Sequence, residues 1–279
     1  MKFWVGTRDD GELVNEDEAF VSVMDHGVTV GDGVFETLKV TRSGAFAVSR
    51  AITRLCASAR ALSLAEPDPD IVRIAVEDVL TANAAELGPL GRMRITYTGG
   101  VAAFGSDREG AVPTLLVGLA AVSPWPETER IVTVPWTRNP DSAIAGVKTT
   151  SYAENVVAFN FAHAHGAGEG VLANTRGELC EGTATNVFVV VDGQVLTPPL
   201  ESGCLAGITR GLVMEWFGAK EQVMPIDVLR DADEIFVTSA TRSVHPVVQA
   251  DDRTWNLAGP ISRDLRASFD EQATRDIDP

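Results

Sequence analysis

The sequence predicts an α/β (α+β) protein of two domains, built from mixed, largely antiparallel sheets with flanking helices. Its 279 residues are 45% hydrophobic and 22% charged, which is typical of a soluble globular chain. Short stretches in which apolar and polar residues alternate, as in strands, are interspersed with stretches whose apolar residues recur at helical spacing. A proline-rich, charged segment at 123–129 separates two such regions. We therefore expect an N-terminal α/β domain over 1–120, a linker over 121–129 and a C-terminal domain over 130–279.

The first region combines strands with two helices. Apolar residues recur at intervals of three and four over 49–64, which predicts a helix, and a second helix is predicted over 70–84, after the Pro67/Pro69 break. Strands are predicted at 3–5, 20–23, 34–40, 92–97 and 114–121.

The second region is similar in kind. Strands are predicted at 131–135, 186–191 and 234–237, and Asp192-Gly193 is a hairpin turn. Helices are predicted over 151–164, from about Thr209, and from Ser262.

Charge and composition exclude several functions. Lys and Arg number 23 against 39 Asp and Glu, so the net charge of −16 disfavours binding to nucleic acid or to anionic membranes. No apolar run approaches the roughly 20 residues that span a bilayer. The N-terminus becomes charged too early for a signal peptide. Three unpaired cysteines suggest no disulfide framework, so we expect a reducing, cytoplasmic location.

Lysine is scarce, and one lysine has an unusual context. Of four lysines, Lys148 follows a small apolar stretch and precedes a predicted helix. Apolar surroundings and a helix N-terminus disfavour the ammonium form, as a Schiff-base lysine requires. Taken alone, the local sequence still favours an exposed loop lysine.

Further sites carry weak signals individually. Glu181 precedes a buried-looking strand, and could either cap a turn or hold a heterocyclic nitrogen protonated. The segment 207–211 resembles an anion-binding helix start, or simple capping. Gly31-Asp32-Gly33 precedes a strand rather than a helix, which argues against a dinucleotide fingerprint. His163 and His165 are too poorly spaced to make a metal pair, so no metal is expected.

These pieces occur in one order along the chain: Asp32-Gly33-Val34-Phe35-Glu36, Arg54-Leu55, Lys148, Glu181-Gly182-Thr183-Ala184-Thr185-Asn186, Gly207-Ile208-Thr209-Arg210 and the turn at 238–241. Order and spacing resemble those of the class IV, fold-type IV, pyridoxal-phosphate enzymes. That group includes branched-chain and D-amino-acid aminotransferases, (R)-amine transaminases and 4-amino-4-deoxychorismate lyases. The resemblance covers residues 3 to 265 and implies a pseudo-barrel in the C-terminal domain.

The resemblance implies a role for each matching residue. Lys148 would carry pyridoxal 5'-phosphate as a Schiff base and move a proton at the substrate. Glu181 would pair with the pyridine nitrogen so that the ring can accept electrons. The other implied cofactor contacts are Arg54, Ile208, Thr209, Ser239 and Thr241 at the phosphate, Leu205 behind the ring and Tyr152 at the ring hydroxyl. Ala51 and Ala240 depart from the family pattern, where a histidine and a threonine are common.

The substrate is less clearly specified. Phe35, Thr37 and Lys39 alternate and should line one wall of the pocket, and the loop at 98–105 should form another. Arg94, Arg138 and Arg242 are possible carboxylate partners, or structural ion-pair residues.

The implied function is an aminotransferase acting between an amino acid or amine and a 2-oxo acid. The alternatives are 4-amino-4-deoxychorismate lyase, which eliminates pyruvate, and a cofactor-binding protein with little catalysis. The resemblance also implies a homodimer. An independent reason is that Phe104 lies in a glycine-rich loop, where a monomer would expose it.

Overall fold

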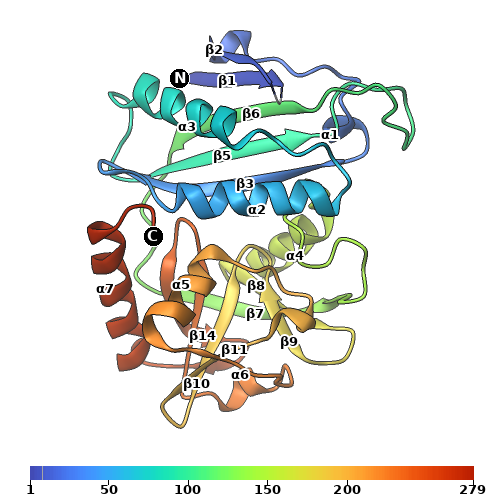
Figure 1. The fold of residues 1–279 in the computed structure, drawn as a ribbon. Coiled ribbons are helices and arrows are strands. Elements are labelled where there is room, and N and C mark those ends of the chain that lie inside the picture. Colours follow the sequence, from blue (N-terminus) through green and yellow to red (C-terminus); the bar gives the residue numbers. More distant parts are fainter. Residues whose placement is uncertain (8) are drawn as a thin grey trace. The chain divides into compact units, whose positions relative to one another are not determined.

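The computed structural model describes residues 1–7 and 9–279, and the chain divides into two compact units (Figure 1). Unit 1 comprises Met1–Pro124, Val147–Tyr152 and Asp276–Pro279, and unit 2 comprises Trp125–Gly146 and Ala153–Arg275. The first passage between the units therefore falls in the proline-rich segment. The short segment that carries Lys148 belongs to unit 1, although the chain on either side of it belongs to unit 2.

Unit 1 contains a six-stranded sheet in which every neighbouring pair is antiparallel. In spatial order the strands are β2 (Gly11–Asn15), β1 (Lys2–Thr7), β6 (Thr114–Ala121), β5 (Gly91–Thr98), β3 (Gly33–Thr41) and β4 (Gly44–Ala45). The helices are η1 (Glu16–Glu18), α1 (His26–Thr29), α2 (Val48–Ala61) and α3 (Pro69–Asn83). Helices α2 and α3 lie along one face of this sheet (Figure 1).

Alternation along β3 separates two sets of side chains. Val34, Leu38 and Val40 are at most 1% exposed and share one face of the strand, while Phe35 and its i+2 neighbours share the other. Because successive strand side chains point to opposite faces, the apolar set packs on the helices. The second set, Phe35 and its i+2 neighbours, lies on the opposite face of the sheet, called the open face below.

The two long helices of unit 1 begin differently. Helix α3 is capped locally, because the Asp68 carboxylate accepts the Asp70 N–H at 2.9 Å and Pro69 is its first residue. Helix α2 is preceded by Ala47, which has φ +58° and offers no side-chain cap. The carboxylate of Asp278 instead accepts the Ser49 N–H at 2.7 Å and the Ser49 hydroxyl at 2.6 Å.

Unit 2 contains a nine-stranded mixed sheet. Eight strands follow one path: β12 (Lys220–Glu221), β11 (Gln194–Thr197), β10 (Asn186–Val191), β13 (Glu234–Ser239), β14 (Ser243–Ala250), β7 (Glu129–Arg138), β8 (Glu169–Asn174) and β9 (Leu179–Gly182). Strand β15 (Arg253–Thr254) pairs with β14. The helices are α4 (Ala153–Ala164), η2 (Leu200–Ser202), α5 (Ile208–Phe217), α6 (Val228–Asp231) and α7 (Pro260–Arg275).

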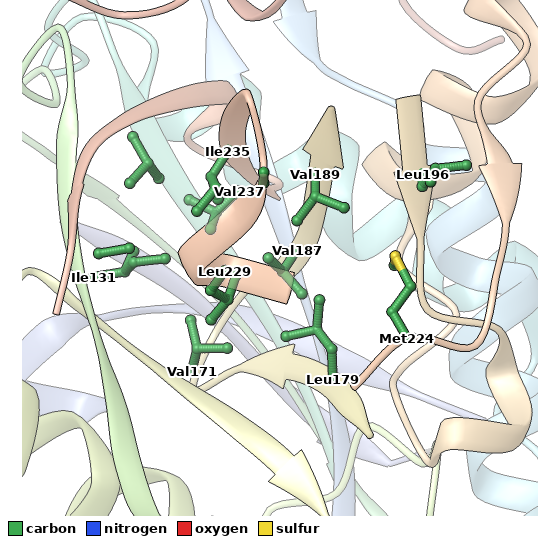
Figure 2. Packing of buried hydrophobic residues seen from close by; sticks show 13 residues of the cluster. Ile131, Val171, Leu179, Val187, Val189, Leu196, Met224, Leu229, Ile235 and Val237 are labelled. Atoms are coloured by element: carbon green, nitrogen blue, oxygen red, sulfur yellow. The ribbon is translucent and has the colours of Figure 1, made fainter. Parts of the chain in front are cut away.

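The core of unit 2 is aliphatic on one side of β10 and β13. Figure 2 shows Val187, Val189, Ile235 and Val237 of these strands packed with Leu229 of α6. On the other side, the rings of Phe188 and Phe236 stack 4.7 Å apart. Both strands are therefore buried on both faces, which explains their unbroken apolar sequence.

Most predicted elements are present with small shifts at their ends. The strand predicted at 20–23 is wrong: these residues form an irregular segment in which Phe20 is 76% exposed and Val23 is 77% exposed. Apolar character alone does not make a strand when no neighbouring strand offers hydrogen bonds. Every helix in the described part of the chain is too short or too polar to cross a bilayer.

Candidate functional site

In unit 1, the segment 147–152 runs along the start of β3. The Phe35 N–H donates to the Lys148 carbonyl at 2.9 Å, and the Thr150 N–H donates to the Gly33 carbonyl at 2.8 Å. These backbone hydrogen bonds place Lys148 beside the Phe35 ring, with Nζ 4.3 Å from the ring centroid. Lys148 is half-buried, so the lysine is not an exposed loop residue.

The Phe35 ring organises a small cationic cluster. The Arg94 guanidinium carbon lies 3.2 Å from its centroid, and Tyr152 meets the ring edge-on with centroids 5.4 Å apart. Arg94 Nε also donates to Thr96 Oγ1 at 3.3 Å. Desolvation against these groups lowers the pKa of Arg94 to about 10, so the guanidinium remains charged at neutral pH. Two cations thus share one aromatic ring with Tyr152.

Gly31, before β3, and Gly33, the first residue of β3, allow this close approach. Gly31 has φ +67°, and its carbonyl accepts the hydroxyls of Thr150 and Ser151, both at 2.8 Å. A Cβ on Gly33 would lie 2.9 Å from the Tyr97 carbonyl oxygen. Larger residues at either position would disturb the backbone that holds Lys148.

Arg54, predicted at the cofactor phosphate, lies on α2 against β3. Its Nε and Nη2 donate to the two oxygens of Glu36 at 2.8 and 2.6 Å. Glu36 is completely buried. This bidentate ion pair fixes the guanidinium plane.

In unit 2, Glu181 is the last residue but one of β9, and each of its carboxylate oxygens lies beside an N–H group. Arg138 Nε lies 3.2 Å from Oε1, and the Leu205 N–H donates to Oε2 at 2.9 Å. Arg138 also pairs with the exposed Glu154 at 3.4 Å. Glu181 is therefore a carboxylate with a neighbouring N–H group at each oxygen, rather than a simple turn acid.

The start of α5 provides a second set of polar groups. Gly207 has no side-chain cap, and a Cβ there would lie 1.9 Å from Asn186 Oδ1. Asn186 donates to the Leu205 carbonyl at 2.8 Å and stands opposite Thr238 in the sheet. The Thr238 hydroxyl is buried and has no hydrogen-bond partner within residues 1–7 and 9–279. Free N–H groups at a helix start and an unused hydroxyl near Asn186 fit an anionic phosphate.

The side chains of the turn between β13 and β14 are only partly available to a ligand, because some of them already contact other residues. Thr241 Oγ1 accepts the indole N–H of Trp125 at 3.3 Å, and the Arg242 guanidinium carbon lies 4.2 Å from the Trp125 ring centroid. Arg242 also pairs with Glu129 at 3.1 Å. Ser239 remains half-buried at the end of β13.

Other candidates are accounted for. Burial raises the pKa of Cys204 to about 11 and raises that of Cys180 further, so neither thiol is a nucleophile. His165 stacks on Phe161, and the His163 ring lies 4.3 Å from that of Phe159 in a tilted arrangement. Across the described chain, no group of three or more His, Cys, Asp or Glu side chains could hold a metal.

Sequence patterns had pointed to Arg138, as a carboxylate partner or structural ion-pair residue, and to Thr238, within the turn at 238–241. The structure pairs Arg138 with Glu181 and leaves the Thr238 hydroxyl unused within the described residues. Asn155, which donates to the Thr183 carbonyl at 2.6 Å, was not found from the sequence, where it is one polar residue of a predicted helix.

The model of the class IV amino-transferase family matches residues 33–250. The chain belongs to the class IV aminotransferase family. This family is dependent on pyridoxal phosphate. A putative branched-chain-amino-acid aminotransferase of Methanocaldococcus jannaschii is 31% identical over 95% of this chain and 96% of its own. The D-alanine aminotransferase of Staphylococcus haemolyticus is 28% identical over 94% and 95%.

Solved structures agree with this assignment. A fold IV transaminase from Curtobacterium pusillum superposes with a TM-score of 0.87 at 28% identity, covering 100% of this chain and 99% of its own. A hypothetical aminotransferase from Mycobacterium tuberculosis, in a form with pyridoxal phosphate bound, has a TM-score of 0.87 at 27% identity, covering 98% and 99%. The predicted fold class and the predicted family are confirmed.

Proposed function

We propose that this aminotransferase transfers an amino group between an amino acid or amine and a 2-oxo acid, with pyridoxal phosphate bound covalently through Lys148. The observation that carries the proposal is the position of Lys148, which β3 holds against Phe35 beside Arg94. Family membership and the cofactor-bound relative support the choice of cofactor.

The cofactor, when bound, supplies an electron sink for reactions at the substrate α-carbon. Lys148 Nζ would bind it and would move a proton at that carbon. Glu181, held by Arg138 and the Leu205 N–H, would keep the pyridine nitrogen protonated. The N–H groups and hydroxyl at Ile208 and Thr209 would bind the phosphate.

The remaining predicted contacts stay proposals of the same kind. Tyr152, which touches Phe35, would hold the ring hydroxyl, and Leu205 would pack behind the ring. Arg54, Ser239 and Thr241 would assist at the phosphate.

Arg94 is the best candidate for the substrate carboxylate. Arg138 and Arg242 pair with acidic residues, whereas Arg94 has no ion pair within the described residues. Phe35, Thr37 and Lys39 would line the same face of β3. A guanidinium over an aromatic ring can bind a carboxylate in a bidentate manner.

The lyase alternative is not favoured, because the matching relatives described above are named aminotransferases. Half-reaction spectroscopy with D- and L-amino acids and amines would identify the donor. Conversion to the pyridoxamine form indicates a transaminase, whereas pyruvate release from aminodeoxychorismate indicates the lyase.

A homodimer is also proposed. Phe20, Val23 and Phe104 are each at least 76% exposed in the single chain. Their segments are joined, since the Ala102 N–H donates to the Met24 carbonyl at 3.3 Å. Such an exposed apolar surface favours a protein partner. Sedimentation at micromolar concentration tests this, and an active species of single-chain mass contradicts it.

A cytoplasmic location is supported by three free, buried cysteines.

The decisive experiment is borohydride reduction of the cofactor-loaded protein, followed by peptide mapping. The label is expected on Lys148. Lys148→Ala should abolish labelling and activity, while Lys220→Ala, an exposed matched control, should change neither. A label on Lys39 or Lys220, or no label, refutes the proposal.

A further inference from the structure

A buried carboxylate in unit 2 contacts the turn that follows Glu181. Glu169, at the start of β8, is completely buried. Its Oε1 accepts the Thr183 hydroxyl in a short hydrogen bond and the Ala184 N–H at 3.2 Å. Two donors of the 182–185 turn therefore converge on one oxygen.

The other oxygen of Glu169 faces a charge that is already paired. Oε2 lies 3.4 Å from Arg242 Nη1 and accepts no hydrogen bond from the described residues, while the same Nη1 is 3.1 Å from Glu129 Oε2. Arg242 Nη2 donates to the Gly168 carbonyl at 3.1 Å. Burial raises the pKa of Glu169, and Arg242 and Thr183 oppose this. A second carboxylate on one buried arginine adds little stability, because desolvation offsets the attraction.

The backbone is shaped to admit this carboxylate. A Cβ on Gly182 would lie 2.1 Å from Thr185 Oγ1 and 3.1 Å from Glu169 Oε1. Gly182 directly follows Glu181, so the carboxylate meets the chain where it leaves β9. Only glycine allows both contacts at this point.

Glu169 is also connected to Glu181 through side chains. Asn155 donates to the Thr183 carbonyl at 2.6 Å, and Arg138 Nη2 donates to Asn155 Oδ1 at 3.3 Å. Arg138 in turn holds Glu181. The turn is thus fixed from both sides, with Glu169 on one and the Arg138–Asn155 pair on the other.

We propose that Glu169 is a positioning residue for cofactor binding. It fixes the 182–185 turn beside Glu181, and it links this turn to Arg242, which lies at the end of the 239–242 turn. The inference rests on the proposed function, since both turns adjoin residues assigned to the cofactor. Glu169 itself acts through Thr183, Ala184 and Arg242 and needs no contact with the cofactor.

Two acids on the same arginine provide a matched comparison. Glu169→Ala removes the contacts to the turn, whereas Glu129→Ala removes a partner of Arg242 and the acceptor of the Arg130 N–H but no contact that Glu169 makes to the turn. Apo protein is titrated with pyridoxal phosphate and the equilibrium Kd is measured by absorbance. We expect Glu169→Ala to weaken binding by about tenfold or more, the usual cost of losing hydrogen bonds to a charged group. Glu129→Ala should stay within about threefold of wild type, even if its unfolding midpoint falls.

A conservative series separates positioning from general stability. Glu169→Gln keeps an acceptor for Thr183 and Ala184 and should recover most of the affinity. Thr183→Val removes one donor without removing a charge, and should weaken binding by about threefold to tenfold. The pH midpoint of the cofactor absorption band should shift in Glu169→Ala and not in Glu129→Ala. If Glu169→Ala does not fold, Thr183→Val decides.

The outcomes distinguish the two proposals. If the wild-type protein binds no pyridoxal phosphate, the proposed function fails and this inference fails with it. If wild type binds and Glu169→Ala or Thr183→Val binds equally well, only the positioning role is overturned. Equal losses in Glu129→Ala and Glu169→Ala also overturn it, because they indicate a shared loss of stability.

Discussion

The two units hold their functional groups in different ways. In unit 1, Lys148 and Arg94 share the Phe35 ring on the open face of an antiparallel sheet, where Lys148 is half-buried and Arg94 is exposed. In unit 2, Glu181 and Glu169 are buried, and each accepts a backbone N–H and lies beside an arginine. A buried carboxylate with a backbone donor and a neighbouring guanidinium stays in place, whereas a cation over an aromatic ring is held less directionally. In the proposed function, unit 1 would supply the nucleophile and the substrate contact, and unit 2 would supply a fixed electrostatic partner.

The largest effect is expected where unit 2 holds Glu181. Glu181→Gln preserves shape but cannot keep the ring nitrogen protonated, so turnover should fall by about 10²-fold, or about 3 kcal/mol of barrier, while cofactor binding survives. Steady-state and single-turnover kinetics measure this. Glu154→Gln is the matched control, because it also pairs with Arg138 but is 85% exposed. Activity of Glu181→Gln within a few-fold of wild type contradicts the assigned role.

Burial in unit 2 should also make its stability sensitive to acid. Desolvation, followed by the nearby charge of Arg242, lowers the pKa of His245 to about 4, and Arg266 adds to this, while the hydrogen bond to the Pro126 carbonyl opposes it. The unfolded histidine binds a proton near pH 6.5, so its contribution is present above that pH. It is lost as pH falls towards 4.

Between pH 7 and pH 5 this group alone should reduce the free energy of unfolding by about 2 kcal/mol. Urea unfolding of wild type and His245→Gln at both pH values tests the difference. His163→Gln, on the exposed end of α4, serves as control. An equal acid effect in wild type and His245→Gln would assign the sensitivity to other groups.

In unit 1, a substitution of Arg94 should mainly weaken substrate binding. Arg94→Gln removes the proposed carboxylate partner and should raise the KM for the 2-oxo acid by about tenfold, with a smaller change in kcat. Arg92→Gln changes the neighbouring exposed arginine on the same face of β5 and should have little effect. Equal KM values in the two variants argue against Arg94.

The smallest effect concerns the capping of α2. Asp278→Ala removes the acceptor of the Ser49 N–H and hydroxyl, and Arg73 lies 3.8 Å from the same carboxylate. Loss of a cap that carries negative charge should lower the free energy of unfolding by about 1 kcal/mol. Chemical denaturation measures it against Glu109→Ala, an exposed acid of the same unit. No difference would show that the long-range cap does not stabilise α2.

Sequence patterns predicted a large part of the fold for local reasons. Alternation identified β3 as a half-buried strand, and the Pro67/Pro69 break placed the start of α3 within one residue. The order of motifs also identified the family, because each motif depends on neighbouring residues. The segment at 20–23 shows where local pattern fails, since strand formation depends on a partner strand.

The partners of the functional groups depended on tertiary structure. Lys148 lies in unit 1 although its flanking chain lies in unit 2, and its position depends on hydrogen bonds to Gly33 and Phe35. Arg138 and Glu181 are 43 positions apart, and no periodicity relates them. The sequence by itself determined which residue types could carry the chemistry and in what order. Only folding decided which charges meet, because burial and pairing join residues that are distant along the chain.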